Sequence, residues 1–282
     1  GPDARADTRA VLRAATAARL EAIAAQVDGV IGYAIGDVEP GESFTRLPDE
    51  VFPAASTIKL AILYELFRQA DEGRVSLDER RPLDRRHAVG GSGVLGLLGT
   101  PALSLRDCAT LMVVLSDNTA TNVIIDAVGL EAVDRRLSAL GLTRTRLRRR
   151  MMDLEAARRG DENVSTPGEL AALLRLLHKG EGLSAASHRA LLDILALPKS
   201  SALRRRLPPE VRVADKPGSL DGIRVEAGIV YAAGRPYVFA AMGAWLADGE
   251  AAERALAEAS AVAFSYFDRL GASSDLGRRI AR

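Results

Sequence analysis

The segment from Phe52 to Tyr64 constrains the fold more than any other stretch of the chain. It reads Phe-Pro-Ala-Ala-Ser-Thr-Ile-Lys-Leu-Ala-Ile-Leu-Tyr, and Lys59 is the only charged residue after Ser56. We predict a helix from Ser56 to about Phe67. Its apolar residues do not keep to one face, so this helix should be buried all round. A buried ammonium group is costly unless it is paired or used, and the fold must therefore give Lys59 a partner.

Ser56 is the nearest candidate for that partner. The two residues are three positions apart, which places them on one face of a helix. Burial lowers the pKa of a lysine, and a neutral amine can take the proton of a serine hydroxyl and make it nucleophilic. The alternative is a helix-capping serine beside a lysine that extends to the surface. A Ser-x-x-Lys pattern alone is too common to decide between the two.

Composition and charge exclude several other kinds of site. A net charge of +1 gives no overall field that would attract nucleic acid or an anionic membrane. The single cysteine, Cys108, excludes an internal disulfide and a cysteine-rich metal site, and three scattered histidines make no convincing zinc motif. No apolar run reaches the roughly 18 residues that a membrane span requires. We therefore expect no metal, no cofactor and no membrane span.

The predicted elements fall into three blocks. The first block is a helix from Asp7 to about Gln26, a strand over residues 29–36 and a short partner strand at residues 43–45. The second block is helical, with helices predicted near residues 104–115, 123–129, 131–140, 166–178 and 183–195. The third block returns to strands, near residues 211–213, 223–231 and 237–244, and closes with a helix from residue 249 to about Leu270.

This order predicts an α/β fold with two lobes. Residues 1–47 and 200–282, from the two chain ends, should combine in one antiparallel sheet with flanking helices. Residues 48–199 should form a central all-helical lobe. The functional site would then lie in the cleft between the lobes.

Two further polar motifs lie at the ends of predicted elements. Ser116-Asp117-Asn118 separates two apolar helices, and by itself it is a cluster of helix-capping residues. Lys216-Pro217-Gly218-Ser219 ends a strand, and by itself it is typical of a Pro-Gly turn. Together with Ser56-x-x-Lys59, they give Ser-x-x-Lys, Ser-x-Asn and Lys-x-Gly in that order, at positions where their side chains can meet in one cleft.

This set resembles the motifs of the penicillin-recognising serine hydrolases, and most closely those of the class A β-lactamases. The similarity extends from the first helix to the last. The resemblance implies that Ser56 is the acylated nucleophile, with Lys59 as its base or as part of its proton network. It implies that Ser116 relays a proton to the leaving nitrogen. It also implies that Asn118 binds the amide of the substrate side chain, while Lys216 steadies Ser116 and attracts the substrate carboxylate.

The resemblance also assigns substrate binding to Gly218, Ser219 and Arg224. The backbone N–H groups of Ser56 and Ser219 would form an oxyanion hole, in which fixed donors stabilise developing negative charge. One departure concerns Pro217, which stands where the family usually has Thr or Ser. The hydroxyl for the substrate carboxylate is thereby lost, and we expect Ser219 and Arg224 to compensate.

The loop after the arginine-rich segment departs further from the family pattern. Family members carry Glu-x-x-Leu-Asn there, and its Glu and Asn hold the water that hydrolyses the acyl-enzyme. An ungapped alignment backward from residues 160–162 places Met151 at the glutamate and Glu155 at the asparagine. Methionine cannot act as a base. Glu155 is the candidate catalytic base if the loop turns it inward, and otherwise it is a surface charge.

We therefore expect a β-lactamase-like serine hydrolase that is acylated on Ser56 by β-lactams and releases the product slowly. One alternative is a D-Ala-D-Ala carboxypeptidase or esterase acting on another acyl substrate. A second alternative is a β-lactam-binding sensor or sink without turnover. We expect a monomer whose partner is a small β-lactam or acyl-peptide. We also expect export to the periplasm or medium, because the opening Gly1-Pro2 resembles a protease scar from which a signal segment has been lost.

The five arginines between Arg144 and Arg150 should not form a nucleic-acid site. Such a site needs a larger basic face with aromatic partners, and we predict a solvated or ion-paired surface instead. Salt-sensitive DNA or RNA binding in the micromolar range, lost when these arginines become Gln, would contradict this prediction.

Overall fold

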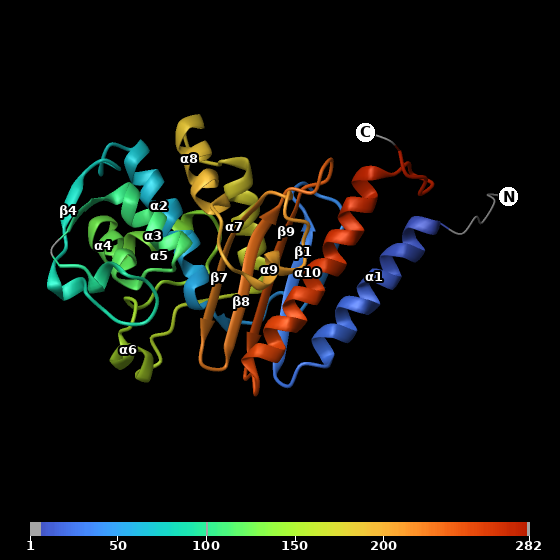
Figure 1. Cartoon of the computed structure of the whole chain (residues 1–282), viewed down its shortest axis with the longest axis horizontal. Helices are drawn as coiled ribbons and strands as arrows, with labels where there is room; N and C mark the ends of the chain where they lie inside the picture. Colours follow the sequence, from blue (N-terminus) through green and yellow to red (C-terminus); the bar gives the residue numbers. More distant parts are fainter. Residues whose placement is uncertain (1–6, 100, 281–282) are drawn as a thin grey trace.

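The computed structural model of the chain describes residues 7–99 and 101–280, so the Gly1-Pro2 pair lies outside the described residues (Figure 1). A five-stranded sheet lies at the centre, in the order β2-β1-β9-β8-β7, and every neighbouring pair is antiparallel. Its strands are β1 (Val30–Asp37), β2 (Ser43–Arg46), β7 (Val213–Leu220), β8 (Ile223–Val230) and β9 (Tyr237–Ala244).

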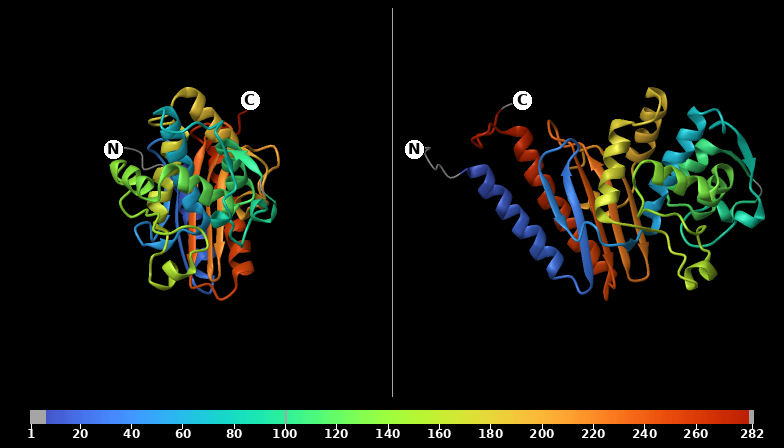
Figure 2. Two further views of the ribbon diagram at one scale, coloured as in Figure 1. Left: turned by 90° about the vertical axis from the view of Figure 1, so that its left-hand side faces the viewer. Right: turned by 180° about the vertical axis from the view of Figure 1, so that it is seen from behind.

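Both ends of the chain contribute to this sheet. Strand β1 pairs with β9 along its whole length, from Val30 opposite Ala244 to Asp37 opposite Tyr237. Helices α1 (Thr8–Ala25) and α10 (Gly249–Ala272) lie side by side on one face of the sheet (Figure 2). The predicted α/β fold with an antiparallel sheet built from both chain ends is confirmed.

The middle of the chain lies on the other face and beyond the β7 edge (Figure 1). Its helices are α2 (Lys59–Asp71), α3 (Leu105–Val114), α4 (Asn118–Val128), α5 (Leu130–Ala139), α6 (Leu154–Arg158), α7 (Pro167–Lys179) and α8 (Ala185–Ala196). Its short strands and 3₁₀ turns are β3 (Phe52–Pro53), η1 (Ala55–Ile58), β4 (Arg80–Pro82), η2 (Arg85–His87), η3 (Leu95–Leu97), β5 (Ala102–Ser104) and β6 (Val164–Ser165). The short helix α9 (Ala202–Arg205) that follows α8 lies instead on the first face, against α10. The lobe boundaries at residues 47 and 200 stay a prediction.

Successive side chains along each strand point to opposite faces of the sheet, and the buried side chains therefore form two cores. In β9, Val238, Ala240 and Met242 pack against the middle helices. Tyr237, Phe239 and Ala241 face α1 and α10 instead. This follows from the two-residue period of a strand, and it explains why β9 is apolar at every position.

Helix α2 is enclosed, as the sequence predicts. Every residue from Lys59 to Phe67 is buried. The predicted start at Ser56 is wrong, because η1 precedes α2 and the α-helix begins only at Lys59. No helix in the described part of the chain combines the length and apolar character needed to cross a membrane.

The Pro-Gly turn suggested by Lys216-Pro217-Gly218-Ser219 is absent. These residues lie inside β7, and the chain turns only afterwards, at Asp221-Gly222, where Gly222 has φ of +73°. Strand β7 is an edge strand with a partner on one side only. The missing N–H of Pro217 is therefore tolerated there.

Several of the clustered arginines are ion-paired. Arg146 pairs with Asp134, Arg149 with Glu162 and Arg150 with Asp126. These pairs agree with the ion-paired interpretation of the segment, and the absence of nucleic-acid binding stays a prediction.

We predict that Phe267 is a major source of stability where the chain ends meet. Its ring is fully buried, stacks on Tyr237 with centroids 4.4 Å apart and meets the edges of Phe44 and Tyr266. Phe267→Ala should lower the free energy of unfolding by about 3–5 kcal/mol. Denaturant titration would measure the loss, with the half-buried Phe264→Ala as control. Equal losses in the two variants would contradict the assignment.

Candidate active site

The turn η1 places Ser56 directly before α2. Strand β3 pairs with β6, and the N–H of Ala54 donates to the carbonyl of Asn163 at 2.8 Å, which fixes the approach to η1. Ala55 has φ of +49°, a conformation that residues other than glycine rarely adopt. Strain of this kind gathers at functional sites because the surrounding structure must enforce it. Ser56 itself is half-buried, so its hydroxyl is accessible.

The amine of Lys59 is surrounded by neutral acceptors. Its Nζ lies within hydrogen-bonding distance of four oxygens: the Oγ of Ser56 at 3.1 Å, the Oγ and carbonyl oxygen of Ser116 at 2.8 Å each, and the Oδ1 of Asn118 at 2.9 Å. The side chain has no exposed surface. Burial, and next the nearby charge of Lys216, hold the pKa of Lys59 well below its ordinary 10.5, although Asp117 opposes them. A lysine in this state can exchange a proton with the serine beside it.

Ser116 lies between two buried amines. Lys216 donates from Nζ to the Oγ of Ser116 at 3.0 Å, opposite the contact from Lys59. Burial is the main cause that lowers the pKa of Lys216 to about 7, while Asp215 and Glu226 raise it. Ser116 has φ of +52°, a second strained backbone position. Its hydroxyl is therefore placed to pass protons between the two lysines and a bound molecule.

Asp117 holds this arrangement from behind. Its Oδ1 accepts from the N–H of Ala120 at 2.9 Å and caps α4, and its Oδ2 accepts from the N–H groups of Val94 and Leu95 at 2.7 and 2.8 Å. Asn118 adds two bonds to the same loop, from its N–H to the carbonyl of Ser92 and from its Nδ2 to the carbonyl of Gly90. The Ser116-Asp117-Asn118 motif therefore fixes the position of the loop over residues 88–98.

The segment Lys216-Pro217-Gly218-Ser219 brings the edge strand β7 against Ser56. A Cβ at Gly218 would lie 2.7 Å from the backbone nitrogen of Ser56 and 3.1 Å from that of Thr57. Only glycine permits this approach without a shift of the backbone. Ser219 follows on β7, opposite Arg224 on β8.

These elements enclose a cleft of about 210 Å³. It is lined by Ser56, Ser92, Ser116, Ser200, Ser201, Ala202, Arg205, Lys216, Pro217, Gly218, Ser219, Arg224, Glu226 and Glu253. Asn118 joins the group through Lys59. Arg224 lies at the margin, where its Nε donates to Glu253 at 2.8 Å. Apart from Glu155, the structure brings all the predicted site residues together.

Glu155 lies elsewhere. Asp153 caps α6 by accepting from the N–H of Ala156, and Glu155 falls in the exposed first turn of that helix. The inward turn that a catalytic role would need is absent, because the Glu155 side chain is exposed on the outside of α6. Met151 is 7% exposed, and Asn122 holds its backbone through both an accepted and a donated hydrogen bond, at 3.0 and 3.3 Å.

Two acidic residues of the site were missed from sequence. Asp215 and Glu226 are both buried beside Lys216. A signal existed for each: Asp215 directly precedes the lysine, and Glu226 is the sole acid in the strand Ile223–Val230. An acid inside an apolar strand needs a reason, because burial of its charge is costly.

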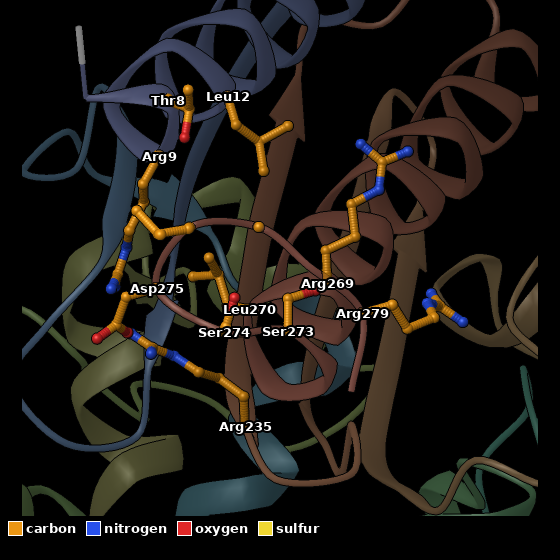
Figure 3. A pocket seen from close by; sticks show the side chains of 12 residues that line it. Thr8, Arg9, Leu12, Arg235, Arg269, Leu270, Ser273, Ser274, Asp275 and Arg279 are labelled. Carbon is orange, nitrogen blue, oxygen red and sulfur yellow. The ribbon is translucent and has the colours of Figure 1, made fainter. Parts of the chain in front are cut away.

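A second hollow, of about 510 Å³, lies between the start of α1 and the end of α10 (Figure 3). Arg9, Arg235, Arg269 and Arg279 contribute to it together with apolar groups such as Leu12. Glu42 and Asp37 hold two of these arginines in ion pairs. No residue of the three motifs lines it, so the chemistry belongs to the cleft at Ser56.

Comparisons with known proteins agree with this geometry. A model of the Beta-lactamase enzyme family matches residues 15–267. Beta-lactamase L2 of Stenotrophomonas maltophilia is 31% identical over 245 residues, which cover 84% of this chain and 80% of that protein.

Solved structures give the same picture. A β-lactamase of Sphaerobacter thermophilus superposes with a TM-score of 0.81 at 32% identity, covering 89% of this chain and 95% of that one. A leucine-to-glutamate variant of PBP-A was solved as an acyl-enzyme complex with penicillin G. It superposes with a TM-score of 0.81 at 28% identity, covering 92% of this chain and 97% of that one.

We predict that Asp117→Asn loosens the loop over residues 88–98. The amide replaces one acceptor oxygen by a donor, so at least one buried N–H loses its partner, at a cost of about 1–3 kcal/mol. Hydrogen exchange at the amides of Val94 and Leu95 should accelerate. The control is Asp107→Asn, an exposed acid in the first turn of α3. Unchanged exchange in Asp117→Asn would show that other contacts hold the loop.

Proposed function

Because the chain belongs to the Beta-lactamase enzyme family and is a serine hydrolase of the β-lactamase type, we propose that it acts through an acyl-enzyme on Ser56. The observation that carries this proposal is the contact between the amine of Lys59 and the hydroxyl of Ser56, at 3.1 Å, in a site that keeps the amine out of water. A neutral amine in that place can act as a base towards the hydroxyl of Ser56.

Acylation then follows from the contacts around Lys59. The amine takes the proton of Ser56, and Oγ attacks the carbonyl carbon of the substrate. Negative charge develops on the carbonyl oxygen, where the backbone N–H groups of Ser56 and Ser219 stabilise it. Ser116 gives its proton to the leaving nitrogen and regains one from Lys59 or Lys216. The hydroxyl of Ser116 lies within 3.0 Å of both amines, which supports this relay.

Substrate recognition divides between the two sides of the cleft. On the sheet side, we propose that Lys216, Ser219 and Arg224 receive the substrate carboxylate, with Gly218 keeping the strand close to the nucleophile. On the helical side, we propose that Asn118 binds the substrate amide. The hydroxyl lost at Pro217 is replaced by that of Ser219, the next outward-facing position of β7 on the same face.

Deacylation is the slow step in this proposal. A water must attack the ester, and at the position that aligns with the family glutamate this chain has the buried Met151. Loss of a positioned base costs about 10²–10⁴ in rate. A variant of the related PBP-A was solved as an acyl-enzyme complex with penicillin G, which supports an acyl-enzyme as an intermediate on this fold. In the extreme case, the protein would be a β-lactam sink or sensor.

A second candidate substrate is an acyl-peptide that ends in D-Ala-D-Ala. It also carries a terminal carboxylate, so the cationic side of the cleft suits it equally. A screen of Ser56-dependent hydrolysis across β-lactams, such peptides and simple esters would separate the two. Export belongs to the proposal as well, because it would place the enzyme where both substrates occur, and cell fractionation would test it.

We predict that Ser56 carries the adduct and that Lys59 is needed to form it. Incubation with a penicillin followed by peptide mass spectrometry should find the adduct on Ser56 and none in Ser56→Ala. Lys59→Met keeps most of the volume but removes the amine, and should slow acylation by about 10²–10⁴-fold. The wild-type rate should rise with pH through the lowered pKa of Lys59, because only the neutral amine is a base. Unchanged acylation in Lys59→Met would move the base elsewhere.

We predict that Met151→Glu shortens the life of the acyl-enzyme. A carboxylate at this position should activate the attacking water and raise the release rate by about 10²–10⁴-fold. The exposed neighbour Met152 supplies the control, Met152→Glu, which should leave the lifetime unchanged. Glu155→Gln should also leave it unchanged. Rapid wild-type turnover, with no gain in Met151→Glu, would show that another group activates the water.

A further inference from the structure

Glu226 is a buried carboxyl group for which the proposed reaction has no use. It lies on β8, is 5% exposed and contributes to the lining of the catalytic cleft. Its Oε1 accepts from the N–H of Ala202 at 2.8 Å. Its Oε2 is buried and has no hydrogen-bond partner within the described part of the chain. A buried carboxylate oxygen without a partner is costly, so this geometry favours the neutral acid.

A second buried carboxyl lies close by and is already satisfied. Asp215 accepts from Lys199 at 3.2 Å, Ser201 at 2.7 Å and Arg204 at 2.9 Å. In the strand register, Asp215 lies diagonally across from Glu226 on the same face of the sheet. The burial of Glu226 and then the charge of Asp215 raise its pKa to about 8, against the opposing effects of the backbone N–H groups of Ala202 and Leu203 and of the charge of Lys216.

The cations around Glu226 are engaged elsewhere. The charged groups of the adjoining elements are Asp215 and Lys216 on β7, Arg224 on β8, Lys199 before α9, Arg204 and Arg205 on α9, and Glu253 on α10. Lys199 and Arg204 bind Asp215, while Arg205 and Arg224 bind Glu253. The side chain of Lys216 leaves the sheet on the face opposite to that of Glu226. Lys216 is paired with Ala227, the residue after Glu226, and its amine reaches Ser116.

The pairing of β7 with β8 places Glu226 next to the proposed site for the substrate carboxylate. Glu226 is opposite Pro217, and the neighbouring pair on the same face is Ser219 with Arg224. An ionised Glu226 would therefore add a negative charge within a few residues of the groups that receive an anion. The neutral acid adds none.

We propose that Glu226 keeps the carboxylate subsite of Lys216, Ser219 and Arg224 open to anions while it is protonated, and closes it to them by charge repulsion when it ionises. This inference rests on the proposed acylation of Ser56. It gives the cleft a preference for anionic substrates that fades in alkaline solution, whereas neutral substrates should not respond. Glu226 shares a face of the sheet with Ser219 and Arg224, so the repulsion acts on an anion bound by these two residues.

The test compares wild type with Glu226→Gln, which keeps an acceptor for the Ala202 N–H. Second-order acylation of Ser56 is measured with benzylpenicillin and with the neutral ester p-nitrophenyl acetate, from about pH 6 to about pH 9.5. The ratio of the wild-type rate to the variant rate should fall roughly tenfold across this range for benzylpenicillin and stay constant for the ester. The ratio removes any loss that both proteins share. Glu253→Gln, which removes an ion-paired carboxylate of the same cleft, should show no such fall.

A second readout does not depend on catalysis. The pKa of Glu226 is higher in the folded than in the unfolded chain, so the stability it confers is lost as pH rises towards about 8. The Tm of wild type should therefore decline relative to that of Glu226→Gln, or of Glu226→Met if the amide folds poorly. Parallel Tm curves, or a constant rate ratio with benzylpenicillin, would overturn the inference while leaving acylation intact. Absence of an adduct on Ser56 in every protein would instead overturn the proposed function.

Discussion

The burial of one ammonium group governs the structure of this protein. Lys59 lies at the start of a helix enclosed on all sides, and its amine finds only neutral acceptors, from Ser56, Ser116 and Asn118. Burial, and next the nearby charge of Lys216, disfavour the charged form of this amine and lower its pKa. The burial that lends the core its stability thus also creates a base beside a hydroxyl.

The remaining architecture brings polar groups to that point. An edge strand can carry a proline and a glycine, so β7 approaches η1 closely and places Lys216 on the far side of Ser116. The turn and loop residues that hold Ser56 and Ser116 are strained at φ values of +49° and +52°. Two contacts hold these strained residues in place. The pairing of β3 with β6 holds Ala55, which precedes Ser56, and the buried Asp117 holds the loop at Ser116. The site is therefore fixed by elements that are distant in sequence.

Much of this could be predicted from sequence, because periodicity and motif order are local signals. The two strand-rich ends, the helical middle and the enclosed helix after Ser56 were confirmed. The role of Lys216-Pro217-Gly218-Ser219 as strand rather than turn could not be predicted, since it depends on β7 lying at an edge. The sequence left open whether Glu155 points inward or outward, and the importance of Glu226 depends on its cross-strand neighbours. The edge position of β7 and the cross-strand neighbours of Glu226 are tertiary contacts that no short pattern encodes.

The central claim is that burial, together with the nearby charge of Lys216, lowers the pKa of Lys59. Titration of the ¹³Cε resonance of Lys59, assigned by comparison with Lys59→Met, measures this directly in the free protein. The account predicts a midpoint well below the ordinary 10.5, together with a separate lowered midpoint for Lys216. A Lys59 that stays protonated up to its ordinary pKa would contradict the account, because the amine could not then serve as the base for Ser56.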